Sequence, residues 1–230
     1  MSLFYQPLIQ EGTHYLDQEE TRHAIKVLRL QNGDPLQLTD GLGNLYKAVI
    51  TTLSKSACHF AIEEVIQVPK QEYSIHIAIA PTKNIDRIEW FVEKATEIGI
   101  DKISFIQCKN SERKVVNMER INKKAVSAMK QSGQVWLPTL HSISKLETYM
   151  NESCDQKYIA HVDQNNPKHL KDAPLQSNYL VLIGPEGDFT QQEIDMAVEN
   201  GFQKISLGPT TLRTETAGLV ACHILNLINS

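Results

Sequence analysis

The sequence predicts an α/β protein in two parts, a small β-rich domain over residues 1–70 and a larger domain over residues 71–230 with a mostly parallel sheet. The first seventy residues contain short runs in which apolar and polar side chains alternate, as they do in half-buried strands. After residue 73, short apolar runs alternate with amphipathic helical segments, which indicates an open sheet covered by helices on both faces. Two of the apolar runs, 180–183 and 205–207, stop at a Gly-Pro pair.

In the first domain, residues 19–34 predict one short helix that ends at Asn32-Gly33, because apolar residues recur there at helical spacing. Residues 35–53 predict two strands around a turn rich in Gly and Asn, and residues 57–68 predict another strand. These elements fit a small barrel. Residues 67–73 are expected to form the linker, since Pro69 interrupts strand pairing.

The second domain follows a strand–helix alternation. Asn84 and Gly99 are the expected caps of an amphipathic helix, and Thr190 with Glu193 forms a capping box at the start of a later one. The predicted strands are 74–80, 102–107, 157–162, 178–184 and 203–208, and the predicted helices are 84–99, 117–133, 190–201 and 214–228.

Composition favours a protein of the reducing cytoplasm. The N-terminus lacks the basic start and apolar run of a secretory signal, and no apolar stretch reaches membrane-spanning length. The four cysteines have no C-x-x-C spacing, so free thiols are expected and no metal site is predicted. The net charge is −4, but residues 109–130 carry seven basic residues against two acidic ones. That segment could bind RNA phosphates or be a solvated helix face, and charge alone favours the second.

The two Gly-Pro stops predict a ligand site, because parallel sheets bind ligands at the carboxyl ends of their strands. Gly184 and Gly208 would allow a ligand to approach the backbone closely, while Pro185 and Pro209 would stiffen the turns. Two tight turns without a ligand would give the same pattern. A dinucleotide fingerprint, a P-loop and a G-x-S-x-G motif are all absent from the sequence.

The segment 207–218, "LGPTTLRTETAG", brings Arg213 and Glu215 to a predicted helix start. Free backbone N–H groups at such a start favour a bound carboxylate or phosphate. Alternatively, Thr214 is an ordinary N-cap and Glu215 is stabilised by the helix dipole.

Together, "IGPEGDFT" and "SLGPTTLRTETAGLVA" resemble the C-terminal motifs of the SPOUT class of knotted methyltransferases, and within it the ribosomal RNA small subunit methyltransferase E family. The stretches 22–48, 81–103 and 128–140 are similar to the N-terminal and middle motifs of that family. The resemblance implies a deep trefoil knot in the second domain, a PUA-like RNA-binding barrel in the first, and a homodimer. The family usually has glycine where this chain has Asp188, Arg-Ile at Thr210-Thr211, and arginine at Gln134.

The implied reaction is methylation of N3 of a uridine in small-subunit ribosomal RNA, presented as the assembled 30S subunit, with S-adenosylmethionine as cofactor. The uracil N3 proton must leave, so a base or a stabiliser of the resulting anion is needed. The candidate base is either Glu215 or Glu186, and Arg213 could stabilise negative charge on the uracil oxygens or hold a phosphate. Two alternatives stay open: a methyltransferase that acts on another RNA such as tRNA, and an RNA-binding module whose transferase site has decayed. The residues implied for the cofactor are Leu182, Gly184, Pro185, Glu186, Gly187, Leu207, Gly208, Leu212, Thr214 and Thr216, and those for RNA are Arg22, His23, Lys26, Arg29, Lys123 and Lys124.

Overall fold

The chain forms two compact units in the computed structural model, which describes residues 2–161 and 168–230. Unit 1 contains residues 1–70 together with 126–137, and unit 2 contains 71–125 and 138–230. The sequence pattern did not indicate that 126–137 groups with the N-terminal residues. Val162, the last residue of one predicted strand, lies outside the described residues.

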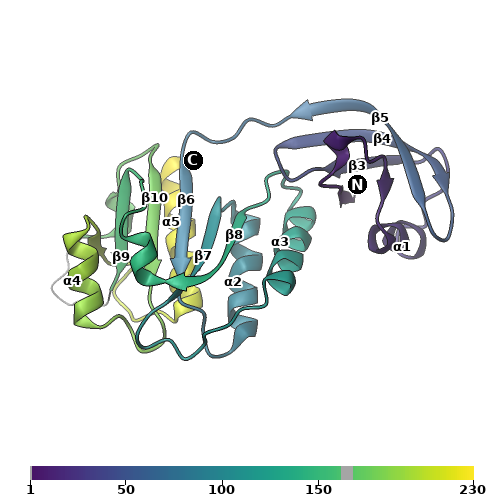
Figure 1. Cartoon of the computed structure of the whole chain (residues 1–230). Coiled ribbons are helices and arrows are strands. Elements are labelled where there is room, and N and C mark those ends of the chain that lie inside the picture. The colour runs from purple at the N-terminus through teal and green to yellow at the C-terminus, as the bar shows by residue number, and fades with distance from the viewer. Residues whose placement is uncertain (1, 162–167) are drawn as a thin grey trace. The chain divides into compact units, whose positions relative to one another are not determined.

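Unit 1 is built on a five-stranded sheet in the order β1-β3-β4-β5-β2. Strands β3, β4 and β5 of this sheet are labelled in Figure 1. The predicted hairpin is confirmed, because β3 and β4 pair antiparallel, and β5 extends the ladder. Only β1 pairs parallel in the described part of this sheet, alongside β3. The strands are β1 Leu3–Tyr5, β2 Tyr15–Leu16, β3 Pro35–Thr39, β4 Asn44–Leu53 and β5 Cys58–Gln67, and a 3₁₀ turn η1 covers Ile9–Glu11.

The helix of unit 1, α1, spans Gln18–Lys26 and begins at Asp17, whose carboxylate accepts the Glu20 N–H at 2.7 Å. It ends before the predicted stop at Asn32-Gly33. Arg29 adopts a left-handed backbone with φ 56°, which a continuing helix cannot contain. Leu28 and Leu30 then pack against the core of unit 1. The prediction was wrong about the end of the helix because apolar residues beyond it serve the core without being helical.

The segment 126–137 is held to unit 1 by backbone pairing. The Gly43 N–H donates to the Val135 carbonyl and the Leu137 N–H donates to the Gly41 carbonyl, both at 2.9 Å. A Cβ atom at position 43 would collide with the Trp136 indole, and Gly43 has φ 92°, so glycine is required there on two grounds.

Unit 2 contains a parallel six-stranded sheet in the order β11-β9-β10-β6-β7-β8, as the alternation of strands and helices predicts. The edge strand β8 was missed, because its alternation is weak and most of its side chains are polar and exposed or half-buried. The strands are β6 Ser74–Ile79, β7 Lys102–Gln107, β8 Thr139–Lys145, β9 Gln156–Ala160, β10 Asn178–Ile183 and β11 Gln203–Ile205.

Helices cover both faces of this sheet, as predicted. Ile194 and Ala197 of α4 share a core cluster with Ala78 and Leu182, whereas α5 packs on α2 and on Ile79, which points to the other face (Figure 1). The helices of unit 2 are α2 Ile85–Ile98, α4 Gln191–Glu199 and α5 Thr214–Asn229, with short 3₁₀ turns η2 Leu146–Tyr149 and η3 Leu170–Asp172. Helix α3 Met118–Ser132 begins in unit 2, and its residues from 126 onward belong to unit 1.

Helix ends in unit 2 follow the predicted capping chemistry. The Asn84 side chain accepts the Asp86 N–H at the start of α2, and Gly99 ends that helix with φ 101°. Thr190 and Glu193 form the reciprocal capping box of α4. Close packing of α5 depends on Gly218, because a Cβ there would lie 2.8 Å from the Phe91 ring.

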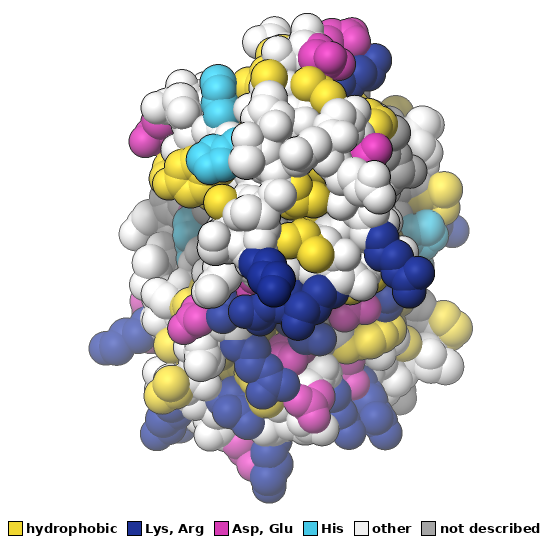
Figure 2. All heavy atoms as spheres, turned by 90° about the vertical axis from the view of Figure 1, so that its right-hand side faces the viewer, with side chains coloured by type: hydrophobic (Ala, Val, Ile, Leu, Met, Phe, Trp, Pro, Cys, Tyr) yellow, Lys and Arg dark blue, Asp and Glu magenta, His cyan; other side chains and the backbone are white. Residues whose placement is uncertain are grey.

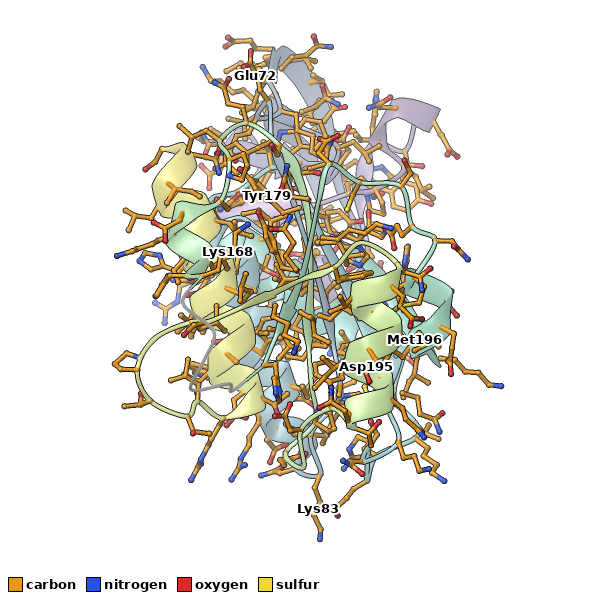
Figure 3. The ribbon with its side chains drawn as sticks, turned by 90° about the vertical axis from the view of Figure 1, so that its left-hand side faces the viewer. Glu72, Lys83, Lys168, Tyr179, Asp195 and Met196 are labelled. Carbon is orange, nitrogen blue, oxygen red and sulfur yellow. The ribbon has the colours of Figure 1, made fainter. Side chains whose placement is uncertain are left out.

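The parallel strands give unit 2 a defined polarity. Glu72 precedes β6 and Lys83 follows it, and Figure 3 shows these two residues at opposite ends of the view, with Lys83 extending outward. The carboxyl ends of the strands therefore meet at the edge that carries Lys83, which is where parallel sheets place their ligands.

Candidate functional site

Two loops that contain Gly-Pro lie at the carboxyl edge of the sheet. One covers residues 184–189 after β10 and the other covers 206–213 after β11, with β9 between the two strands. The Thr214 hydroxyl, at the start of α5, donates to the Gly184 carbonyl at 3.0 Å. This hydrogen bond joins the first loop to the residue that directly follows the second loop.

The two Gly-Pro glycines have different roles. Gly208 has φ 144°, and apart from its own atoms and those of its two chain neighbours no heavy atom of the described residues lies within 4 Å of the position where a Cβ would sit. The space beside this part of the backbone is therefore open. A Cβ at Gly184 would lie 3.0 Å from the Phe189 ring, so glycine at that position serves close packing within the loop. The backbone thus borders open space at Gly208 and a packed ring at Gly184.

Asp188, which departs from the family pattern, has a left-handed backbone with φ 59°. Glycine adopts this conformation without cost, and Asp tolerates it better than most residues. One carboxylate oxygen accepts the Phe189 N–H at 2.7 Å, and the other lies 2.9 Å from His161 Nδ1 at the end of β9. Asn110 Nδ2 donates to the Asp188 carbonyl at 3.0 Å. The loop therefore keeps the glycine-like conformation with a charged side chain fixed in place.

The first turn of α5 carries a buried carboxylate. Arg213 is the N-cap residue and makes no side-chain capping bond, so the alternative that Thr214 is the N-cap is wrong. Thr214 is instead the first helical residue, and its hydroxyl donates to the Gly184 carbonyl. Glu215 is only 6% exposed, and its Oε1 lies 3.7 Å from Arg87 Nε. Its Oε2 is buried without a hydrogen-bond partner among the described residues.

The two candidate carboxylates thus have unlike surroundings. Glu186 is exposed, and its Oε1 accepts the Lys83 N–H at 3.0 Å. It lines a surface pocket of ≈ 470 Å³ together with Lys83, Asn84, Arg87 and Glu112. Glu215 lines a neighbouring pocket of ≈ 350 Å³ together with Asp86, Arg87, Trp90, Arg213 and Thr216.

The other residues implied for the cofactor lie in or beside these loops, with one exception. Leu182 is fully buried in β10 and belongs to the apolar core, so it packs in the strand that leads into the first loop. Leu207 and Leu212 are half-buried on the second loop. Pro185 is buried, and Gly187 is exposed, with its carbonyl accepting Asn110 Nδ2 at 3.0 Å.

The residues implied for RNA form two separate groups. On α1 and just after it, Arg22, His23, Lys26 and Arg29 are all exposed. On α3, Lys123 pairs with Glu119 at 2.8 Å, and Lys124 lies 3.9 Å from Glu93. The α3 lysines are thus partly neutralised, whereas the helical spacing of Arg22 and Lys26 places them on one face of α1. On the face that Figure 2 draws, most Lys and Arg side chains lie in the lower half, with acidic side chains among them.

Two residues that line the smaller pocket, Arg87 and Trp90, were missed. They lie three residues apart on α2 and therefore share a face. Trp90 is 42% exposed, which is unusual for so large an apolar side chain. The signal in the sequence is a tryptophan among the charged positions of an amphipathic helix, where a covering helix needs no large apolar side chain.

A second polar cluster lies within the sheet of unit 2, at His76. Its Nδ1 is 3.0 Å from Glu152 Oε1 and its Nε2 is 2.8 Å from Ser104 Oγ. Lys102 Nζ donates to the same Glu152 oxygen at 2.7 Å. Burial lowers the pKa of His76, which favours the neutral ring. Because the Glu152 carboxylate can only accept, Nδ1 carries the hydrogen and donates to it, and Nε2 accepts a hydrogen bond from the Ser104 hydroxyl. The hydrogen bond from His76, together with Lys102, lowers the pKa of Glu152 to about 2.

No group of three or more His, Cys, Asp or Glu residues that could hold a metal ion occurs in the described ranges. Among the same residues, no helix has the length and apolar character needed to cross a membrane.

Two family models match most of the chain. Residues 69–226 match the RNA methyltransferase domain, and residues 16–63 match the RNA methyltransferase PUA domain. A probable rRNA-methyltransferase from Porphyromonas gingivalis is 39% identical, with a TM-score of 0.94 over 100% of this chain and 98% of that one.

Two relatives carry the name of the family that the motifs resemble. The ribosomal RNA small subunit methyltransferase E of Neisseria gonorrhoeae, solved bound to S-adenosyl methionine, is 26% identical, with a TM-score of 0.88 over 100% of this chain and 98% of that one. The protein of the same name from Rickettsia conorii is 27% identical over 90% of this chain and 87% of its own length. The resemblance is confirmed, and the chain belongs to the family of RNA methyltransferases that join this domain to a PUA domain.

Proposed function

We propose that this protein methylates N3 of a uridine in small-subunit ribosomal RNA, with S-adenosylmethionine as the methyl donor. The observation that carries the proposal is the pairing of the two Gly-Pro loops, through Thr214 and Gly184, beside a buried carboxylate with an unused oxygen. Relatives along the whole chain support it, since they are named for methylation of small-subunit ribosomal RNA and one was solved with the cofactor bound.

The residues of the two loops fit the cofactor. Open space at Gly208 would admit a ligand to the backbone, and the half-buried Leu207 and Leu212 would supply apolar contacts. The backbone of 184–187 would supply polar ones. The proposal includes the family's deep trefoil knot around these loops, the closure of the unit 1 sheet into a barrel, and a homodimer acting in the cytoplasm on the 30S subunit.

The cofactor, when bound, would supply an electrophilic methyl group; the protein must remove the N3 proton of the uracil so that this nitrogen becomes nucleophilic. Glu215 can accept the N3 proton, because its Oε2 is buried and unused while Arg87 lies beside Oε1. Arg213 and Arg87 line the same pocket and can stabilise negative charge that develops on the uracil oxygens. Glu186 is exposed and its Oε1 is engaged by the Lys83 N–H, which makes it the weaker candidate for the base.

RNA binding is assigned to residues 1–70 as a PUA-like domain, with residues 71–230 as the methyltransferase domain. The exposed basic residues Arg22, Lys26 and Arg29 can contact phosphates, and Lys123 and Lys124 contribute in the second domain.

The test compares Glu215→Gln with Glu186→Gln on 30S subunits from a strain that lacks the enzyme. Glu215→Gln is expected to lower single-turnover methyl transfer by about 10²–10⁴-fold and to change its pH dependence, because the proton acceptor is lost. Glu186→Gln should retain most activity. Mapping of the methylated nucleoside identifies its position. Methylation of tRNA alone, or arrest of the reaction by Glu186→Gln alone, would contradict the assignment.

A further inference from the structure

The pocket of ≈ 350 Å³ beside the start of α5 combines three kinds of group. One is the exposed Trp90 of α2, the second is the guanidinium pair of Arg87 and Arg213, and the third is the buried carboxylate of Glu215. Helices α2 and α5 pack against each other, so these side chains from distant parts of the sequence face one space. The cofactor loops at Gly184 and Gly208 are not among its walls.

The two oxygens of the Glu215 carboxylate in this pocket have different surroundings. Glu215 Oε1 lies 3.7 Å from Arg87 Nε, while Oε2 is buried and has no hydrogen-bond partner among the described residues. A buried acceptor without a partner costs free energy, so its persistence suggests a ligand that donates to it. The ligand must present an N–H or O–H to Oε2.

Trp90 and the two arginines restrict the ligand further. An indole that is 42% exposed at the wall of a pocket offers a flat surface on which a planar ring can stack. Guanidinium groups donate hydrogen bonds and cannot accept them, so the ligand must carry acceptors beside its donor. One N–H flanked by two carbonyl oxygens on a flat ring is the imide edge of uracil.

We propose that this pocket receives the target base, with Trp90 as the stacking surface, Glu215 Oε2 facing the imide N–H, and Arg87 and Arg213 facing the carbonyl oxygens. This inference rests on the proposed function and names the residues that select its substrate. The arrangement discriminates against cytosine, whose ring nitrogen at the same position is an acceptor and would face the carboxylate. Trp90 is a positioning residue, because it holds the ring while Glu215 takes the proton.

The first experiment uses fluorescence. The chain has two tryptophans, so Trp136→Phe leaves Trp90 as the only indole emitter. Uridine 5′-monophosphate is expected to quench this emission by stacking, and cytidine 5′-monophosphate at the same concentration should quench it much less. Equal quenching by both nucleotides would refute the selectivity of the pocket, and no quenching by either would refute the stacking.

The second experiment uses kinetics on 30S subunits. Trp90→Leu is expected to lower kcat/KM for the RNA roughly ten- to hundredfold, as loss of one base–aromatic stack does elsewhere. Trp90→Phe should recover most of it, and the affinity for S-adenosylmethionine should be unchanged in both variants. Val198→Ala on α4, 45% exposed and away from the pocket, is the control.

The outcomes separate the pocket from the proposed function. If Trp90→Leu methylates normally but sediments as a smaller species than the parent, the tryptophan joins two copies of the chain and the inference is wrong. If the parent neither binds S-adenosylmethionine nor methylates RNA while uridine still quenches Trp90, the proposed function fails and the base pocket stands.

Discussion

The hydrogen bond from the Thr214 hydroxyl to the Gly184 carbonyl can be removed by Thr214→Val, which keeps the shape of the side chain. Thr214 is 5% exposed and Gly184 is half-buried, so the carbonyl is not fully rehydrated when its donor is lost. A hydrogen bond of this kind contributes about 1–1.5 kcal/mol. For a protein of this size the thermal midpoint should fall by about 3–5 °C.

The same bond connects the two loops assigned to the cofactor, so its loss should also loosen the binding site. We expect the dissociation constant for S-adenosylmethionine, measured by calorimetry, to rise about five- to tenfold. Thr214→Ser keeps the hydroxyl and should restore both properties. Thr211→Val, exposed on the second loop, is the matched control and should change neither. A lower midpoint with unchanged cofactor affinity would show that the bond serves folding alone, and the argument for a joined site would fail.

Two further predictions concern backbone geometry and pH. Gly208→Ala and Gly201→Ala should both reduce stability modestly, since both glycines have positive φ in open space, but only Gly208→Ala should weaken cofactor binding in calorimetry; equal affinities would place the cofactor elsewhere. Acid should destabilise the fold from pH 6.5 downward, because His76 and Glu152 both have lowered pKa values and the unfolded chain therefore takes up protons first. Glu152→Gln should flatten the part of that dependence between pH 4.5 and about 2, as urea unfolding at a series of pH values would show; an unchanged slope would refute the role of Glu152.

Local sequence signals predicted most elements of unit 2, because each signal acts within a few residues. The caps at Asn84 and Gly99 and the capping box at Thr190 depend only on neighbouring backbone groups. Strand β8 and the true end of α1 escaped prediction because tertiary neighbours decide them. An edge strand needs little apolar alternation, and Leu30 is drawn into the core without being helical.

Only part of the candidate site could be predicted, because local motifs can be read from the sequence and tertiary neighbours cannot. The segments that hold Gly208, Arg213 and Glu215 were identified from their sequence motifs. Arg87 and Trp90 come from a helix far away in the sequence, and only the packing of α5 on α2 brings them beside Glu215. The role of Gly184 as space for the Phe189 ring also needed coordinates.

The inclusion of residues 126–137 in unit 1 has a consequence for how the protein is made. Val135 and Leu137 pair with the turn at Gly41–Gly43, and Lys130 forms an ion pair with Glu20 of α1. During synthesis, the first seventy residues leave the ribosome well before these partners exist. Trp136, whose indole packs against Gly43, is synthesised after the whole of α2. Unit 1 therefore completes its packing only after a large part of unit 2 has been translated, and a fragment cut at Lys70 would lack these contacts permanently.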